Sequence, residues 1–426
     1  MSTPLTRRAF ARAGVAAAAA AAPAFYGPWR VNAAFAQAKP IRIGLTCDSS
    51  GQYGAGGQDE LNGIRLAIDE FNGRGGVLGR PIQWITADTE TSPQTASRIA
   101  ERFITQEDCA FLIGAVHSGV AHAITQVADR HGVIYLNTNS SAPSEARENC
   151  SRVKFVWDAN GTNFAKAIVA SAINMFGTRC LLLTNDYEWG RETSTATQIL
   201  VQANGGRIAG ELLVPPNTRD FSPYLRKIRD IKPDVVAMAI AGEDLKALRA
   251  QVVNAKMHLN PTWISSQQDW PDIWGAPDTL FGIFGTTWYH KLNLPGVAAF
   301  VRRWQSAHGN GPIPVPGNVS YNGYMAMREL LRAIERAGVA NNIKIIQQLE
   351  MLKIPAKDRM QHLDAYMNPD THHLQQTIYL ARHNPRPSDD TDYYEILSWT
   401  DPKSVEDPAS DLCRLVPYEQ VPLVDS

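Results

Sequence analysis

The stretch DSSGQYGAGGQDELNGIRLAIDEFNGRGGVLGRP, residues 48–81, places a loop of glycine and hydroxyl residues directly before a helical pattern. The preceding residues 41–46 are apolar enough for a buried strand, and apolar residues recur at helical spacing through 58–72. Glycine-rich loops between a strand and a helix often contact small anions, because backbone N–H groups point outward there. The stretch therefore raises the question of which solute this loop contacts.

The spacing of the glycines disfavours a dinucleotide. GQYGAGG lacks the pattern G-x-G-x-x-G, and Asp88, the acid available for a ribose, follows much later than the usual ~20 residues. The sequence shows no other cofactor motif, so we expect no cofactor. An exported cofactor-dependent enzyme remains an alternative, because the amino terminus resembles an export signal used by folded, often cofactor-loaded proteins.

Composition excludes further classes. The 426 residues favour two domains, and 44% hydrophobic with 19% charged residues is typical of a globular chain. Lys plus Arg number 41 against 42 Asp plus Glu, which argues against a nucleic-acid-binding protein. A nucleophile elbow at Ser118 lacks its glycine, since Val116 stands there. The histidine pair at 372–373 is interpreted as a polar surface turn, so we expect neither catalysis nor a metal site.

Residues 1–38 carry the pattern of a twin-arginine export signal. Arg7 and Arg8 precede an alanine-rich apolar stretch, and AQA at 36–38 is a small-residue cleavage site. The apolar stretch is too short for a stable membrane span. We therefore expect a mature protein located in the periplasm.

Strand and helix patterns alternate along the rest of the chain. Strands are predicted at 41–46, 82–88, 110–115 and 133–138, with helices between them, and the pattern restarts after residues 155–163. Such alternation predicts an α/β fold with two parallel-sheet units of similar plan. Two later helices and a late strand at 375–384 follow the second unit.

Polar residues recur just after the predicted strands of the first unit, where parallel strands bring them to one edge of the sheet. They are Tyr53 with its serines, then His117 and Ser118, then Asn139, Ser140 and Ser141. Hydroxyl groups and amides at helix starts can hold a carboxylate without a formal positive charge. The sequence therefore predicts an anion-binding edge.

Three stretches carry a resemblance to a known family: IRIGLTCDSSGQYG, then NGIRLAIDEFNGRGGVLGRPIQWITADTETSPQTA, and LIGAVHSGVA. They resemble the solute-binding proteins of branched-chain amino acid type ABC transporters, which have a type I periplasmic-binding fold. The resemblance implies two Rossmann-like lobes joined by a three-strand hinge, with a ligand cleft between them. It places lobe 1 at 39–156, lobe 2 at 157–288, the return helices of lobe 1 at 289–373, and the return strand and tail of lobe 2 at 374–426.

The resemblance also implies a set of ligand contacts. Ser118, Asn139, Ser140 and Ser141 would hold the ligand carboxylate, and Tyr53 would form a wall of the cleft. Lobe 2 would contribute Tyr187 and Trp189. Amino acid binders place an acid on this lobe to pair the ammonium group, but here Gln267 stands about where that acid is expected, with Asp269 close by.

This departure, together with several tryptophans in lobe 2 including Trp288, favours a small carboxylate, aromatic in particular, over an amino acid. We expect none of Asp269, Glu188 and Glu243 to pair an ammonium group. The predicted function is capture of such a solute by a monomeric, non-enzymatic protein that passes it to a membrane permease. Binding of a branched-chain amino acid or an amide by the same fold is the alternative.

The five cysteines leave at least one thiol unpaired. Cys109 and Cys180 begin apolar runs, whereas Cys150 and Cys413 lie in polar loops and are the better candidates for a bridge. In the family picture both loops pass the hinge, which implies a disulfide between Cys150 and Cys413.

Overall fold

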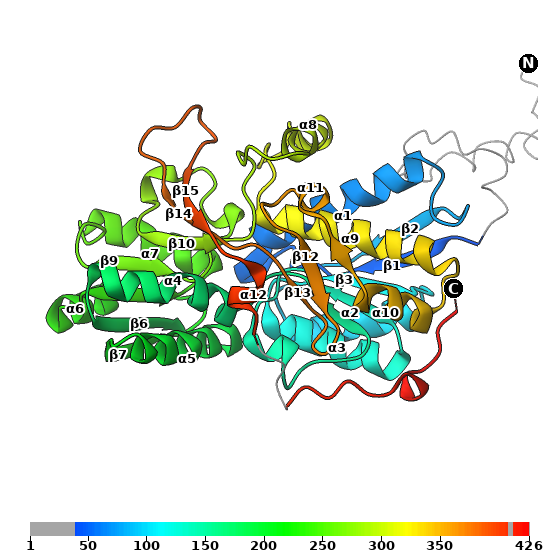
Figure 1. Cartoon of the computed structure of the whole chain (residues 1–426), viewed down its shortest axis with the longest axis horizontal. Helices are drawn as coiled ribbons and strands as arrows, with labels where there is room; N and C mark the ends of the chain where they lie inside the picture. The colour runs from blue at the N-terminus through cyan, green and yellow to red at the C-terminus, as the bar shows by residue number, and fades with distance from the viewer. Residues whose placement is uncertain (1–38, 408–411, 426) are drawn as a thin grey trace, which may run out of the picture. The chain divides into compact units, whose positions relative to one another are not determined.

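The computed structural model describes residues 39–407 and 412–425 (Figure 1). The predicted export signal at 1–38 lies outside these residues. Within the described part of the chain, no helix is both long and apolar enough to cross a membrane. The described residues form two β-sheets, and we define lobe 1 and lobe 2 as these sheets with the helices packed on them.

The lobe 1 sheet has eight strands in the order β11-β12-β13-β5-β4-β3-β1-β2. Strands β1 to β5 are parallel, whereas β11 and β12 add antiparallel pairs at one edge. The strands are β1 (Ile41–Leu45), β2 (Ile82–Thr86), β3 (Phe111–Gly114), β4 (Ile134–Asn137), β5 (Lys154–Val156), β11 (Lys353–Ile354), β12 (Ala365–Asn368) and β13 (His373–Gln375). The helices that follow them or pack beside them are α1 (Gly54–Gly73), α2 (Pro93–Thr105), α3 (Ser118–His131), α8 (Val297–His308), α9 (Asn318–Ala337), α10 (Asn342–Glu350) and α11 (Ala356–Arg359).

The lobe 2 sheet has seven strands in the order β15-β14-β10-β9-β8-β6-β7. Its parallel part is extended by the antiparallel strands β14 and β15. The strands are β6 (Arg179–Asn185), β7 (Arg207–Val214), β8 (Val235–Ala239), β9 (Thr262–Ser265), β10 (Ile283–Thr286), β14 (Tyr379–His383) and β15 (Tyr394–Trp399). The helices are α4 (Gly161–Phe176), α5 (Glu188–Ala203), α6 (Ser222–Ile231), α7 (Gly242–Asn254) and α12 (Pro402–Val405).

Helices α1 and α9 run side by side in lobe 1 (Figure 1). Gly63 on α1 makes this close approach possible, because a Cβ atom there would lie 1.9 Å from the carbonyl oxygen of Ser320 on α9. The late helix α9 thus packs on α1, the first helix of lobe 1, as the return of the chain to lobe 1 implied by the family resemblance requires. At α2, Ser92 accepts a hydrogen bond from the N–H of Thr95 and Pro93 opens the helix, both residue types being favoured at these positions.

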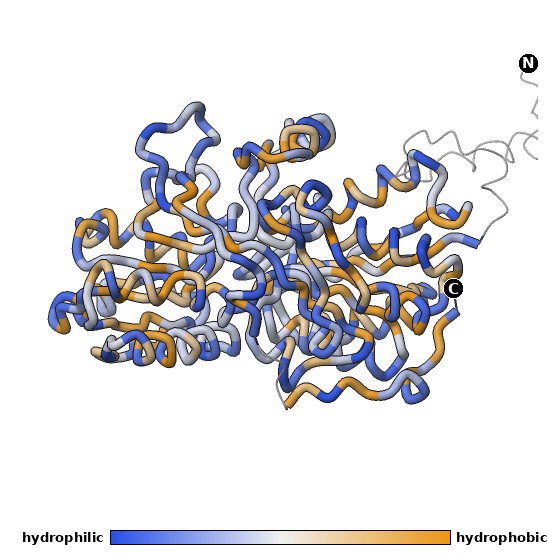
Figure 2. Tube along the Cα trace, in the orientation of Figure 1, coloured by the Kyte–Doolittle hydropathy of each residue, from blue (hydrophilic) through white to orange (hydrophobic). Residues whose placement is uncertain are grey.

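The chain passes between the sheets at three places, which we call crossovers 1, 2 and 3. Crossover 1 joins β5 to α4, crossover 2 follows β10 on the way to α8, and crossover 3 joins β13 to β14. The predicted late strand at 375–384 is thus divided, with its first residue in lobe 1 and β14 in lobe 2. The loop 384–393 beyond β14 is hydrophilic (Figure 2).

Two interpretations of the later sequence are corrected. His372 and His373 are not in a surface turn, since each is 1% exposed. His372 stacks on Phe155, and His373 begins β13. The tail also contains the strand β15, which the run of polar and proline residues around it concealed.

The structure pairs Cys150 with Cys413 in a disulfide whose Cα atoms are 5.6 Å apart. Cys47, Cys109 and Cys180 are free and buried. The bridge joins the loop before β5 to the tail, and the tail then contacts lobe 1 again, where the carbonyl oxygen of Val416 accepts a hydrogen bond from Arg152 at 2.9 Å.

Candidate functional site

A polar pocket lies between the carboxyl ends of the strands of the two sheets. Every residue that lines it follows the end of a parallel strand, as expected for ligand sites in such sheets. The lining residues are Tyr53, Val116, Asn139 and Ser141 from lobe 1, and Tyr187, Trp189, Ala241, Gln267, Asp269 and Asp272 from lobe 2. The structure thus brings together Tyr53, Asn139, Ser141, Tyr187, Trp189 and Gln267 of the predicted set, which as ligand contacts stay predictions.

Tyr53 reaches the pocket from the glycine-rich loop that follows β1. Gly57 permits the turn into α1, because a Cβ atom there would lie 2.0 Å from the carbonyl oxygen of Asp48. The Tyr53 hydroxyl makes a hydrogen bond with the hydroxyl of Tyr187 on lobe 2. Burial raises the pKa of Tyr53 and of Tyr187, so both hydroxyls are neutral. The glycines therefore serve close backbone packing and the placement of this tyrosine.

The backbone N–H groups before α3 are occupied by a carboxylate of the chain itself. Asp48 Oδ2 accepts hydrogen bonds from the N–H groups of Val116 at 2.8 Å and His117 at 2.9 Å. Ser118 begins α3, is 1% exposed and does not line the pocket. His117 stacks on the Tyr187 ring with centroids 5.0 Å apart. The anion-binding position expected here is thus partly filled by Asp48.

The polar residues after β4 divide into two groups. Asn139 lines the pocket, but its side-chain Nδ2 donates to Glu60 of α1 at 2.8 Å and its Oδ1 accepts from Asn322 of α9 at 3.2 Å. Ser140 is fully buried and donates to Glu145 at 2.9 Å, away from the pocket lining. Of these three residues, Ser141 is the one whose side chain bonds to lobe 2.

Ser141 and Gln267 join the two lobes. The Ser141 hydroxyl donates to Gln267 Oε1 at 2.9 Å. Gln267 Nε2 donates to Asp158 Oδ2 at 3.0 Å and to Asp269 Oδ1 at 2.9 Å. Because the amide oxygen accepts while the nitrogen donates twice, these three partners fix the orientation of the side chain.

Two aspartates make the pocket acidic. Asp269 Oδ1 also accepts from Asn318 Nδ2 at 2.7 Å, and Asp272 Oδ2 accepts from the N–H of Gly242 at 2.9 Å. Burial raises the pKa of both carboxyl groups, that of Asp272 to about 7. No lysine or arginine is among the described residues that line the pocket.

Asp272 is the residue that sequence reasoning missed. It and Asp269 follow β9 in the run SSQQDWPD, so two acids after one strand end were the available signal.

Of the two tryptophans predicted as ligand contacts, one lines the pocket and the other packs elsewhere. Trp189 lines the pocket, whereas Trp288 stacks on Tyr321 with centroids 4.7 Å apart and donates to the carbonyl oxygen of Met360.

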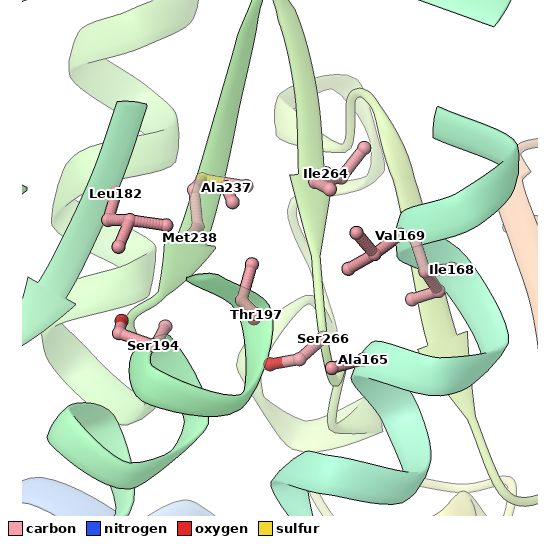
Figure 3. A pocket seen from close by; sticks show the side chains of 11 residues that line it. Ala165, Ile168, Val169, Leu182, Ser194, Thr197, Ala237, Met238, Ile264 and Ser266 are labelled. Carbon is pink, nitrogen blue, oxygen red and sulfur yellow. The ribbon is translucent and has the colours of Figure 1, made fainter. Parts of the chain in front are cut away.

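A second, mostly apolar cavity lies inside lobe 2 between helices α4 and α5 and the sheet (Figure 3). Ile168 and Val169 of α4 and Ile264 of β9 face it, with the Ser266 hydroxyl beside them (Figure 3). None of the predicted site residues lines this cavity, so we interpret it as a gap in the core packing of lobe 2.

Comparison with known proteins agrees with this geometry. Residues 40–390 match the periplasmic binding protein family, and the chain belongs to that family. A Leu/Ile/Val-binding protein of Rhizobium johnstonii is 26% identical over 196 residues, which cover 46% of this chain and 53% of that protein, about half its length.

Two solved structures share the fold. A periplasmic binding protein of Burkholderia mallei has a TM-score of 0.79 and 21% identity, covering 90% of this chain and 98% of that one. A solute-binding protein of an ABC transporter from Rhodopseudomonas palustris, solved with 3,4-dihydroxybenzoic acid, has a TM-score of 0.77 and 20% identity, covering 87% and 99%. The predicted family and two-lobe α/β fold are confirmed, and the family is one of solute-binding proteins and not of enzymes.

Proposed function

We propose that this chain captures a small solute in the polar pocket and delivers it to the permease of an ABC importer in the periplasmic space. The observation that carries the proposal is the pocket lining, which combines residues of both lobes. A solute bound there contacts both lobes at once and favours the conformation in which they are close together, because a ligand shifts an equilibrium by its differential affinity.

The charge of the pocket favours a solute with a protonated amino group. Asp269 and Asp272 are its only formally charged lining residues in the described chain. A solute with a carboxylate alone would place a further negative group beside these carboxyl groups, which raises the free energy of the complex wherever they are ionised. An amino acid offers an ammonium group to the aspartates and a carboxylate to the Ser141 side of the pocket.

The geometry thus supports the alternative of an amino acid over an amine-free carboxylate. The Leu/Ile/Val-binding relative is consistent with this choice. Tyr53, Tyr187 and Trp189 supply a partly aromatic wall, which suits an apolar or aromatic amino acid side chain.

An aromatic acid is the second candidate, and one observation favours it. Burial raises the pKa of Asp272 to about 7, so this carboxyl is partly protonated near neutral pH and can then donate to an anion. The Rhodopseudomonas palustris relative was solved with such an acid. This mode of binding predicts an affinity that falls as pH rises through about 7.

A matched set of solutes tests the proposal. Calorimetry compares phenylalanine and leucine with 3-phenylpropionate and 4-methylpentanoate, which lack only the amino group, and with 3,4-dihydroxybenzoate. A solute at 100 times its dissociation constant also stabilises the protein by roughly 2.7 kcal/mol, which a thermal shift detects. We expect an amino acid to bind at least tenfold more tightly than its amine-free analogue, the equivalent of ~1.4 kcal/mol. Equal or tighter binding of the amine-free acids would contradict the proposed chemistry.

A further inference from the structure

Asp158 lies in crossover 1, between β5 and α4, and is fully buried. Its Oδ1 accepts hydrogen bonds from the N–H of Ala159 at 3.0 Å and from the hydroxyl of Thr287 at 3.2 Å. Its Oδ2 accepts from Gln267 Nε2 at 3.0 Å, and its backbone carbonyl oxygen lies 2.8 Å from Nε2 of His373. Apart from its neighbour Ala159, Asp158 therefore contacts three different segments of the chain.

Two of these contacts lie in or next to a crossover, and the third lies in the pocket. Thr287 follows β10 in crossover 2, and His373 begins the strand that leads into crossover 3. Gln267 lines the pocket. Asp158 thus joins crossovers 1 and 2, and the strand that leads into crossover 3, to a residue of the pocket, and it does so through both carboxyl oxygens and its backbone.

The side-chain amide of Gln267, which lines the pocket, has a defined orientation. Gln267 donates to Asp158 and Asp269 through its nitrogen while its oxygen accepts from Ser141 of lobe 1, because the amide has one acceptor end and one donor end. Reversal of the amide would set its oxygen against the two aspartate oxygens and remove both donations, whereas the Ser141 hydroxyl can also accept. A change in the distance between the lobes therefore acts on Asp158 through the same side chain that positions Asp269.

We propose that Asp158 is a positioning residue that couples the polar pocket, through Gln267, to crossovers 1 and 2 and to strand β13, which leads into crossover 3. When the lobes are close, the Ser141–Gln267 bond orients the amide and Asp158 fixes the crossovers. When they separate, that orientation is released. The inference rests on the proposed function only in taking this pocket as the solute site, and its test is done without solute, so the two can fail independently.

Gln361 offers a matched control, because its side chain bonds to crossovers 2 and 3. Gln361 Nε2 donates to the carbonyl oxygen of Thr287 at 2.6 Å and to Gln376 Oε1 at 3.1 Å, but Gln361 does not line the pocket. Gln361→Met removes hinge hydrogen bonds with a side chain of similar volume. It therefore separates loss of hinge bonding from loss of the connection to the pocket.

The experiment measures the populations of separated and close lobes in the solute-free protein. Lys344 on α10 and Gln198 on α5 are exposed, and each is replaced by cysteine and spin-labelled for electron-electron distance measurement. The native free cysteines are buried and the other two are paired, so the introduced sites take the labels. The variants Asp158→Asn, Ser141→Ala and Gln361→Met are compared alone and in pairs.

Asp158→Asn keeps the size of the side chain but sets an amide nitrogen against one of the hydrogen-bond donors. We expect it to shift the population toward separated lobes by about fivefold, as loss of one hydrogen bond does. Combined with Ser141→Ala, it should add little to either single change, because both act through Gln267. Combined with Gln361→Met, its effect should be closer to additive, because Gln361 has no bond to Gln267 and shares only Thr287 with Asp158, through the Thr287 backbone.

Additive effects in both pairs, or an unchanged distance distribution in Asp158→Asn, would overturn the inference, since a purely structural aspartate would change only the melting temperature. If Asp158→Asn does not fold, Thr287→Val replaces it in the same cycle. Thr287→Val removes the crossover 2 bond to Asp158, and coupling between it and Ser141→Ala is then the expected result. Independence of those two changes would equally overturn the inference.

Discussion

Tyr53 of lobe 1 and Tyr187 of lobe 2 meet hydroxyl to hydroxyl across the polar pocket. Beside them, Gln52 Nε2 donates to Asp244 Oδ2 of lobe 2 at 3.2 Å. Together with the Ser141–Gln267 and Asn318–Asp269 bonds, these contacts join the lobes at the pocket. They are among the contacts that set the balance between separated and close lobes.

Loss of a tyrosine hydroxyl should weaken solute binding. Tyr187→Phe removes one partner of the bond with Tyr53 while the ring stays against His117 and Trp189. We expect affinity for the best amino acid of the solute set to fall about fivefold, as for one hydrogen bond. Calorimetry measures it, with Tyr224→Phe on α6 as the control that leaves affinity unchanged. Unaltered binding in Tyr187→Phe would show that the hydroxyl pair is incidental.

Neutralising the pocket should act on the amino group of the solute. Asp269→Asn removes one charge that would pair the ammonium, and a charged hydrogen bond is worth roughly 1.5–3 kcal/mol. We expect affinity for the amino acid to fall by roughly ten- to a hundredfold. The amine-free analogue should bind no worse than to the unmodified protein.

Asp278→Asn, an exposed aspartate on the same lobe, is the matched control and should leave both affinities unchanged. Equal losses for the amino acid and its analogue would mean that Asp269 supports the pocket structurally and does not contact the amino group.

Stability should fall as pH rises from about 6.5 to about 8. Burial raises the pKa of Asp59 and Glu60 to about 7 and that of Asp158 to about 8. In this range the folded protein releases these protons, whereas the unfolded chain, with carboxyl pKa values near 4, has already lost them. The folded state therefore binds more protons, and stability decreases with pH.

Buried histidines oppose this slope at its acid end. Burial lowers the pKa of His117 to about 4, of His290 to about 3 and that of His372 and His373, so the unfolded chain still binds their protons near pH 6.5 but has released most of them by about pH 7.5. Urea unfolding at several pH values gives the slope, and Asp158→Asn should make it shallower. A slope that is flat or positive between about pH 7.5 and 8 would contradict the buried carboxyl groups.

Glycine at position 63 should be required for stability. Gly63→Ala places a methyl group against the Ser320 carbonyl oxygen and forces α1 and α9 apart, at a cost of roughly 1–3 kcal/mol. Gly73→Ala, at the end of the same helix with no atom within 4 Å of the new Cβ, should be neutral or slightly stabilising. Denaturant unfolding of the two variants checks this. Equal stabilities would refute the close packing of the helices.

The disulfide should be present in the exported protein and should stabilise it. Mass mapping without reduction should find the peptides of Cys150 and Cys413 linked, because the structure pairs them. Replacing both by serine should lower the free energy of unfolding by roughly 2–5 kcal/mol, since the bridge closes a long loop. Reductant should then have no further effect on the variant. Free thiols at both positions in the native protein would rule the bridge out.

The alternation of strands and helices, and the edge at which the pocket forms, could be predicted from the sequence. Parallel strands bring the residues after their carboxyl ends together, so the position of Tyr53 placed it at this edge, whereas Tyr187 and Gln267 were proposed from the family resemblance. The antiparallel strands β12 and β15 were not found, because their short patterns lie among polar residues whose pairing depends on distant partners.

Side-chain direction within the pocket could not be predicted in the same way. Ser140 and Ser141 are neighbours, yet one bonds to Glu145 in its own lobe and the other to Gln267 across the pocket. Asp269 lines the pocket two residues after Gln267, because the backbone after β9 continues along the pocket before η4 (Trp270–Asp272) begins. Such displacements follow from local backbone paths, which a spacing argument does not contain.

The Asp48 carboxyl group accepts hydrogen bonds from the backbone N–H groups before α3, in the place that a bound anion would take. Redesign of this protein as a sensor for another solute is therefore best begun in lobe 2, where Gln267, Asp269 and Asp272 can be exchanged while lobe 1 remains a fixed scaffold. The same aspartate offers a second route. Its removal would free two backbone donors and offer that scaffold as a starting point for a receptor of anions.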